Sequence, residues 1–331
     1  MADFGAKAET YGKKFKPFFP VLADAKLDGR RLLVKIENLK ATALSGSGKD
    51  LSKKLYIICN YLVKKIKKYG LKNGVFDGEL VSVLRPNDTY TSMWGKTGII
   101  TVKNPTVEQQ RIIDEDIKFA IFDFCSLSIF DENSCFEDII PCKKRDEILY
   151  NILDDTVHLG KGCVAYYLEK EILENEEDLE DFYQEKLREG FEGAVFKDPK
   201  MSYKNYQRTA CWIKRKPVIT IDCKIVDFEK GSNKNSNRLG KIIVQTEEGL
   251  VKVGGGLKDT PKGQWNLKKL QGTEKEFQTL KVESLNDRTT IWKFRHFLKG
   301  EIIEVKYQDD SHKVADCRFL RFVRFRPDIK K

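Results

Sequence analysis

The feature that most constrains the fold of this chain is a change of pattern at Pro217. Before this residue, apolar segments with the period of a strand are mixed with segments that have the period of a helix. After it, the apolar segments are short and strand-like, and Gly, Asn and Ser separate them. A chain of 331 residues is long enough for two domains with separate cores. The sequence therefore predicts an α+β fold, with one domain over residues 1–217 and a second over residues 218–331.

The first of these domains is predicted to contain sheets flanked by helices. Apolar residues recur at helical spacing over 50–69, and Gly70 is placed to end that helix. An acidic amphipathic helix is expected over 168–188, its charges forming a solvated face. Strands are expected over 32–37, 74–83, 119–124 and 192–197. We expect these strands to form antiparallel sheets, with the notable charged residues at strand ends or turns.

The second domain is predicted to be a small β-barrel. Strands are expected over 219–229, 241–246, 250–253, 301–307 and 318–326. Five short strands of this kind suit an OB-fold, the oligonucleotide-binding barrel. Gly254–Gly256 would interrupt the third strand, and residues 257–296 form a polar insertion with little strand pattern. This insertion is either a disordered loop or a segment that contacts a partner.

The net charge of +10 is unevenly distributed along the chain. Residues 197–331 contain 31 Lys and Arg against 17 Asp and Glu, whereas residues 1–196 contain 29 against 33. A basic C-terminal part indicates a polyanionic partner, of which nucleic acid is the usual one. The alternative is a lysine-rich surface that serves solubility alone.

The eight cysteines and three histidines argue against a zinc cluster, because no Cys-x-x-Cys pair occurs. Several cysteines lie in apolar runs, which suits reduced, buried thiols. The N-terminus has no apolar signal region, and no window approaches about 18 apolar residues. We therefore expect a soluble intracellular protein, cytoplasmic or associated with the nucleoid or nucleus.

Lys26, two residues before Asp28-Gly29, is a candidate nucleophile. Alone, this string would be a surface turn. A free lysine has a pKa near 10.4, so it needs nearby positive charge or a dry pocket to become a neutral amine. Lys214 and Lys216 alternate along a predicted strand and so share one face. If that face meets Lys26, we expect it to lower the pKa of Lys26 and to bind phosphate; otherwise it is a basic sheet edge.

Two carboxylates and one aromatic ring complete the candidate site. Glu79 and Glu192 each lie beside a glycine at a strand end. If they converge, they suit a divalent cation such as Mg²⁺ that also contacts phosphate; otherwise they are ordinary turn acids. Phe122 is either a ring that stacks on a base or a core residue. A histidine-based catalytic triad is disfavoured, because the three histidines lie in no motif.

Together, these residues and their order resemble the covalent nucleotidyltransferases, most closely the small ATP-dependent DNA ligases of viral and phage type. The resemblance extends from Phe18 to Asp328. It implies a nucleotidyltransferase (adenylation) domain followed by an OB-fold, with Lys26 forming a lysyl-AMP intermediate and Asp28 completing the catalytic pair. The implied ATP site contains Ala25, Lys26, Arg31, Glu79, Phe122, Lys214, Lys216, Arg324 and Arg326. The implied metal ligands are Glu79 and Glu192, and the implied DNA contacts are Arg208 and Arg321.

The resemblance also implies the reaction and the partners. ATP and Mg²⁺ (or Mn²⁺) would serve as cofactors, and a nick in double-stranded DNA would be sealed by a monomer with no membrane contact. AMP would pass from Lys26 to the 5′-phosphate, and the 3′-hydroxyl would displace it. Residues 257–286 are the candidate for an insertion that helps to encircle DNA. With only about 25 residues before Lys26, no separate N-terminal DNA-binding domain is expected.

Two departures from the family pattern and several rival functions stand beside this interpretation. The chain has Ser45-Gly46 where the family usually carries Ser-Arg, and it ends Asp328-Ile329-Lys330 where the family normally has Asp-Lys, so Lys330 is a possible substitute. An RNA ligase or an mRNA-capping guanylyltransferase is the enzymatic alternative. A non-catalytic DNA-binding relative is another, and an NAD-dependent ligase is disfavoured because it would need a nicotinamide-binding segment and normally a four-cysteine zinc site.

Overall fold

The computed structural model describes residues 6–12, 16–84, 91–92, 94–130, 140–153, 163–205, 207–247, 249–259, 270–308 and 318–329. Contacts divide the chain into two compact units, Met1–Lys216 and Pro217–Lys331. Helices and strands are mixed, and the strands described form three sheets. These observations confirm the α+β class.

One sheet of the first unit has the strand order β1-β11-β10-β2-β9. Its strands are Lys7–Thr10 (β1), Val21–Lys26 (β2), Lys170–Leu173 (β9), Gly193–Lys197 (β10) and Arg208–Arg215 (β11). Lys26 is therefore the last residue of β2, which pairs on both sides and is buried up to Lys26 itself. Because β2 is paired along both edges, the position of the Lys26 side chain at its end is well defined.

The second sheet of this unit has the order β4-β3-β5-β7-β8, with β6 paired to β5. Its strands are Arg30–Glu37 (β3), Lys40–Ser45 (β4), Gly74–Leu84 (β5), Thr91–Ser92 (β6), Ile117–Cys125 (β7) and Ala165–Tyr167 (β8). β1–β11 and β7–β8 pair in parallel, which differs from the expected antiparallel sheets. Both parallel pairs join strands separated by long connections, as parallel pairing requires.

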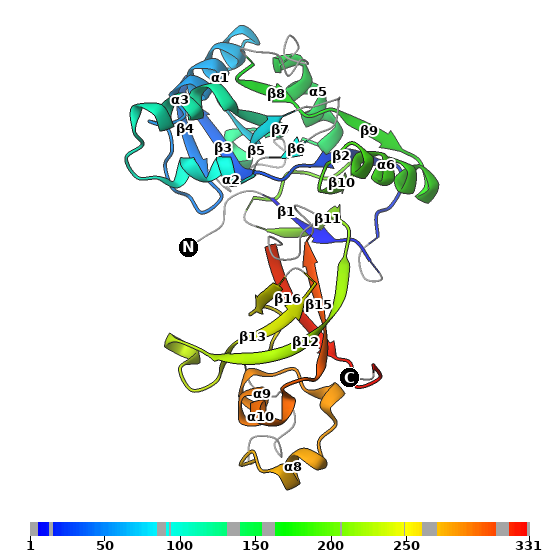
Figure 1. Ribbon diagram of the computed structural model, residues 1–331. Helices are drawn as coiled ribbons and strands as arrows, with labels where there is room; N and C mark the ends of the chain where they lie inside the picture. Colours follow the sequence, from blue (N-terminus) through cyan, green and yellow to red (C-terminus); the bar gives the residue numbers. More distant parts are fainter. Residues whose placement is uncertain are drawn as a thin grey trace. The chain divides into compact units, whose positions relative to one another are not determined.

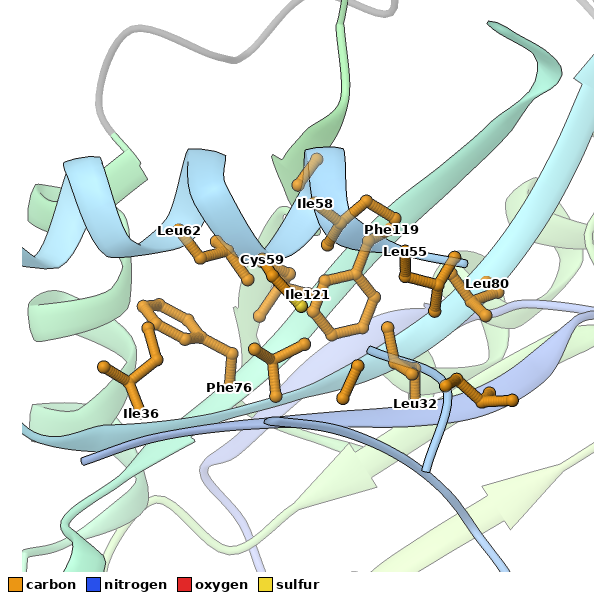
Figure 2. Packing of buried hydrophobic residues seen from close by; sticks show 14 of the residues in the cluster. Leu32, Ile36, Leu55, Ile58, Cys59, Leu62, Phe76, Leu80, Phe119 and Ile121 are labelled. Atoms are coloured by element: carbon orange, nitrogen blue, oxygen red, sulfur yellow. The ribbon is translucent and has the colours of Figure 1, made fainter. Parts of the chain in front are cut away.

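Helix α1, Tyr56–Lys68, covers one face of this second sheet (Figure 1). Ile58, Leu62 and Ile66 recur every four residues and are buried against sheet residues such as Phe76 and Phe119 (Figure 2). The helix begins six residues later than the sequence predicts, since residues 52–55 form turns. Those turns are stabilised where the Ser52 hydroxyl accepts the amide of Ala43 in β4.

The remaining helices of this unit are short or lie at its surface. They are Trp94–Thr97 (α2), Gly98–Thr101 (η1), Val107–Asp116 (α3), Leu127–Phe130 (α4), Cys142–Leu153 (α5) and Glu176–Arg188 (α6). Helix α6 begins only after Asn175, whose side chain caps it, because residues 170–173 extend the sheet as β9. The prediction of a helix from 168 was wrong at that end. No helix in the described parts of the chain is long and apolar enough to cross a membrane.

The second unit contains one sheet with the order β14-β13-β12-β15-β16. Its strands are Ile219–Lys230 (β12), Leu239–Thr246 (β13), Gly249–Val253 (β14), Ile302–Gln308 (β15) and Arg318–Phe325 (β16), with Asn233–Asn235 (η3) between β12 and β13. All five predicted strands are confirmed to within two residues. Alternate residues of these strands, such as Val244, Ile303 and Phe325, are buried in a separate core.

Residues 270–296, the larger of the two described parts of the predicted insertion, contain helices that pack on this core. They are Glu274–Gln278 (α8), Val282–Ser284 (η4), Arg288–Lys293 (α9) and Arg295–Leu298 (α10). They gather at one end of the sheet (Figure 1). Ile291, Phe294 and Leu298 are buried there. The alternative of a disordered loop is therefore wrong for this part, because apolar residues spaced three or four apart bury a helical face. The other alternative, a segment that contacts a partner, stays a prediction.

Candidate active site

Lys26 opens into a pocket of about 220 Å³ in the first unit. The charged residues described along its lining are Lys7, Lys26, Arg31, Lys197 and Lys214, with Asp24 and Glu79 as the acids. This lining carries more positive than negative charge, which favours a polyanionic ligand. Phe122 and Trp212 supply aromatic walls, and Ala25 contributes to the lining beside Lys26.

The candidate nucleophile and one candidate metal ligand are in direct contact. Lys26 Nζ lies 2.5 Å from Glu192 Oε2, and Lys216 Nζ lies 3.1 Å from Glu192 Oε1. Pairing of β2 with β10 produces this contact, because Lys26 is opposite Gly193 and its carbonyl accepts the Glu192 amide at 3.0 Å. One carboxylate therefore bridges two lysines that are 190 residues apart in the sequence.

The charge state of Lys26 differs from the prediction. Burial lowers the pKa of Lys26, but attraction to Glu192 and Glu79 outweighs burial, so the pKa lies above its ordinary value. The sequence predicts that Lys214 and Lys216 lower the pKa of Lys26 if their strand face meets it. Lys216 instead shares the Glu192 carboxylate, and the two lysines hold the pKa of Glu192 below its usual range despite burial. In this arrangement Lys26 is an ammonium group at neutral pH, and attack requires it to lose that proton.

Glu79 is the second candidate metal ligand, and it lies on β5 opposite Arg31 of β3. Burial raises the pKa of Glu79 to about 7, helped by repulsion from Glu192, although Lys26 and Arg31 oppose the shift. Gly29 permits this packing, since a Cβ there would lie 2.6 Å from Glu79 Cγ and 2.4 Å from a backbone oxygen. The Asp28 carboxylate also acts electrostatically on Lys26.

Phe122 lies on the pocket wall between two cations. The Arg31 guanidinium is 4.7 Å from its ring centroid, and Lys197 Nζ is 4.8 Å from it. Trp212 meets the same ring edge-on at 6.1 Å. These contacts hold the ring in place while its position on the pocket wall leaves it available to a ligand.

Sequence reasoning missed the buried charges behind these residues. Lys197 Nζ lies 2.5 Å from Asp24, and Arg31 forms a bidentate pair with Asp77. The period of two along a strand could have found Asp24, because it precedes Lys26 by two residues. The same period places the uncharged wall residue Trp212 on the strand face of Lys214. No local signal in the sequence marks Asp77 as the partner of Arg31, because that contact crosses from β3 to β5.

The four remaining predicted site residues are arginines, one in the first unit and three in the second. Arg208 opens β11, where its backbone pairs with Lys7. Arg321, Arg324 and Arg326 belong to the end of the chain in the second unit. Arg324 pairs with Glu304 at 2.7 Å, and Arg326 pairs with Asp222 and Asp328.

One of the two departures from the expected motifs can be located. Gly46 follows β4, and a Cβ at this position would lie 3.4 Å from Arg31 Cβ. The absent arginine would therefore have stood beside Arg31. Lys330 lies outside the described residues.

The acidic residues of the pocket can provide only part of a metal shell. Among the residues that the structure describes, no three His, Cys, Asp or Glu side chains gather as a metal site. Glu79 and Glu192 supply two carboxylates that influence each other electrostatically. Mg²⁺ prefers oxygen ligands and commonly combines one or two carboxylates with water and substrate phosphate oxygens. Glu79 and Glu192 therefore suit a Mg²⁺ ion that is also coordinated by the phosphate oxygens of a bound substrate.

Comparisons with known proteins agree with this geometry. Residues 5–216 match the family described as ATP dependent DNA ligase domain. A probable DNA ligase from Streptomyces griseus is 23% identical over 242 residues, which cover 71% of this chain and 43% of that protein. The chain spans about two fifths of the length of this and similar curated relatives.

Solved structures share the fold. The structure named Pmar-Lig_PreS3 has a TM-score of 0.69 and 22% identity, covering 98% of this chain and 67% of that one. A structure of Lig E DNA ligases, described as DNA binding with a minimal scaffold, has a TM-score of 0.63 and 18% identity, covering 98% of this chain and 100% of that one. Both likenesses extend through the two units.

Proposed function

We propose, because the chain belongs to the ATP-dependent DNA ligase family, that it seals nicks between a 5′-phosphate and a 3′-hydroxyl in duplex DNA. The observation that carries this proposal is the contact of Lys26 with Glu192 at a positively charged pocket. A lysine ammonium, a bridging carboxylate and an aromatic wall suit covalent transfer of a nucleotide from ATP.

In the first step, the neutral amine of Lys26 attacks the α-phosphorus of ATP. An Nζ–P bond forms, the bond from the α-phosphorus to the bridging oxygen breaks, and pyrophosphate leaves with that electron pair. The proton of the attacking amine passes to solvent. Lys214, on the pocket wall, and Lys216 would hold phosphate oxygens, while Phe122 would stack on the base and Arg31 and Ala25 would complete the nucleotide site.

A divalent cation held by Glu79 and Glu192 would neutralise phosphate charge and compete with Lys26 for the Glu192 carboxylate. Loss of that ion pair would weaken the attraction that raises the pKa of Lys26, so the amine would form more readily. Asp28 is proposed as the second catalytic residue because of its place in the nucleophile motif, two residues after Lys26. Its charge raises the pKa of Lys26, so its role lies outside the loss of the Lys26 proton.

In the later steps, the 5′-phosphate of the nick attacks the phosphorus of lysyl-AMP and releases Lys26. The 3′-hydroxyl then attacks the 5′-phosphate, a phosphodiester bond forms and AMP leaves. Arg208 and Arg321 are proposed to contact DNA phosphates, and the monomer is the proposed active species. Each transfer depends strongly on positioning and charge neutralisation, as phosphoryl transfers generally do.

We assign the second unit as an OB-fold domain, with the first unit as the adenylation domain. The end of the β14 segment returns to β16, since the Phe322 amide donates to the Gly255 carbonyl at 3.0 Å. Gly256 has a φ of 83°, and a Cβ there would lie 2.1 Å from the Phe322 carbonyl oxygen. Contact between the two outer strands of the sheet supports a closed barrel.

The test is self-labelling with α-labelled ATP, GTP or NAD in the presence of Mg²⁺. We expect an acid-stable, hydroxylamine-resistant protein label from ATP alone, lost on chelation and lost in Lys26→Ala. Lys16→Ala is the matched control, because Lys16 forms an exposed pair with Glu176 outside the pocket. Label from GTP would instead indicate capping chemistry, and sealing of nicked RNA but not nicked duplex DNA would contradict the proposed substrate.

A further inference from the structure

A buried tyrosine outside the pocket lining completes a ring of hydrogen bonds around two residues that line it. Tyr203 is 3% exposed. Its hydroxyl donates to Asp77 Oδ2 at 2.5 Å and accepts the Ala6 amide at 3.3 Å. Arg31 Nη2 donates both to Asp77 and to the Ala6 carbonyl, the latter at 3.2 Å. The four residues Tyr203, Asp77, Arg31 and Ala6 thus form a closed ring of contacts.

This ring joins segments that are far apart in the sequence. Ala6 leads into β1, Arg31 lies on β3, Asp77 on β5, and Tyr203 in the connection between β10 and β11. Only Arg31 and Ala6 of the four line the pocket, and Lys7 and Ala8 of β1 continue the same wall. The ring therefore attaches one wall of the pocket to the sheet that carries Glu79.

The protonation states of the ring members determine which of them donate hydrogen bonds and which accept them. Burial raises the pKa of Tyr203 well above its ordinary value, so its hydroxyl keeps the proton that it donates. The Asp77 carboxylate is fully buried and accepts from both Arg31 and Tyr203. Removal of one donor would leave the buried Asp77 carboxylate without one of its hydrogen-bond partners, which costs free energy. The four residues of the ring are therefore held in one arrangement.

We propose that Tyr203 is a positioning residue for the nucleotide site, acting through Asp77 and Ala6 to hold Arg31 and the β1 wall where ATP binds. This inference rests on the proposed function. Tyr203 is not among the residues that line the pocket, so we expect it to affect the affinity for ATP rather than the bond-making step. A purely structural role would lower stability and leave the ATP dependence unchanged.

Tyr203→Phe is the deciding variant. It removes the hydroxyl and keeps the ring, which packs edge-on against Trp212 at 6.1 Å and lies 5.7 Å from the Arg145 guanidinium. We expect the ATP concentration for half-maximal self-labelling to rise about tenfold, while the limiting rate changes less than about twofold. Tyr167→Phe is the matched control, because Tyr167 donates to Asp146 at 3.1 Å outside the pocket lining. An unchanged ATP dependence in Tyr203→Phe would overturn the proposal.

Two further measurements separate this inference from the proposed function. If Tyr203 acts through Arg31, the effects of Tyr203→Phe and Arg31→Lys on ATP dependence are not multiplicative in the double variant, whereas multiplicative effects contradict the ring. Amide hydrogen exchange over residues 6–10 should be faster in Tyr203→Phe and unchanged in Tyr167→Phe. A parent protein that takes no label contradicts the ligase proposal alone, and the exchange result then decides on Tyr203: equal exchange in all three proteins rejects its role.

Discussion

The two units of this protein pair their charges in different surroundings. In the first unit, Lys197 and Asp24 lie 2.5 Å apart with 2% and 3% of their side chains exposed. In the second, Arg324 and Glu304 lie 2.7 Å apart with 57% and 17% exposed. Separation of a buried pair leaves an uncompensated charge away from water, whereas an exposed pair exchanges its partner for water or another anion at little cost.

This difference shows how each unit would meet a phosphate. The first unit has its cations already in place, since Lys197 and Arg31 are fixed by buried carboxylates before any ligand arrives. The second unit presents arginines whose surface partners a phosphate can displace. Lys26 lies between these extremes, since 21% of its side chain is exposed and its ion-pair partner, Glu192, is 12% exposed.

The largest expected effect comes from breaking a buried pair. Lys197→Met keeps the length of the side chain and leaves Asp24 without its cation, so we expect unfolding to become easier by about 3–5 kcal/mol. Burial already raises the pKa of Asp24. The variant therefore allows Asp24 to take up a proton, and the loss should be larger at pH 8 than at pH 6, as measured by guanidinium unfolding.

Lys16→Met provides the matched control for this experiment. Lys16 and Glu176 lie 2.6 Å apart, but 56% and 60% of these side chains are exposed. We expect no measurable change in the unfolding midpoint. Equal losses in the two variants would show that burial does not distinguish the pairs.

A smaller effect, of opposite sign, is expected for Glu79→Gln. The pKa of Glu79 is raised from 4.5 to about 7, mainly by burial, so the folded protein binds this proton more tightly than the unfolded chain. The contribution of Glu79 to stability is then greatest below about pH 4.5 and is lost as the pH rises through about 7. At about 1.4 kcal/mol per pKa unit, Glu79→Gln should stabilise the fold at pH 8 by at most about 3 kcal/mol.

The same variant should lose activity while it gains stability. Self-labelling by the parent protein should increase as Glu79 ionises between pH 6 and pH 8, and Glu79→Gln should show neither that increase nor the loss of stability. Unfolding curves at pH 5 and pH 8 give the comparison. A variant that is less stable than the parent at pH 8 would contradict the raised pKa.

The third prediction concerns Lys26, whose side chain is more exposed than that of Lys197 and less exposed than that of Arg324. Glu192→Gln removes the carboxylate that attracts Lys26, so the pKa of Lys26 should fall. The variant should nevertheless label more slowly, because it also loses the contact that aligns Lys26 with Lys216. The pH dependence of Lys26 modification by an amine reagent measures the first effect. A pKa that stays unchanged would mean that Glu79 and Asp28 raise it without Glu192.

Local patterns in the sequence predict much of this molecule. Alternation of apolar residues predicts the five strands of the second unit. The contacts of Lys26 and Lys216 with Glu192 meet one condition set for the candidate site, while the roles of these residues stay a prediction. The strands could be predicted because strand periodicity is a local property.

The failures have non-local causes. Residues 170–173 have a helical pattern but extend a sheet, because pairing with β2 outweighs their local preference. The raised pKa of Lys26 depends on which carboxylate it meets, and β2–β10 pairing decides that. The ring through Tyr203 joins four segments, so no window of the sequence contains it.

The smallest effects on stability should come from the second unit. Arg324→Ala removes a mostly exposed partner of Glu304, so the unfolding midpoint should not move measurably. If Arg324 exchanges Glu304 for a phosphate, the variant should bind nicked duplex DNA more weakly, and the salt dependence of binding should fall by about one unit of slope. Glu304→Gln should have the reverse effect, since it releases Arg324 without removing it. A loss of stability together with an unchanged salt slope would show that this surface pair is structural and that the contrast between the units fails.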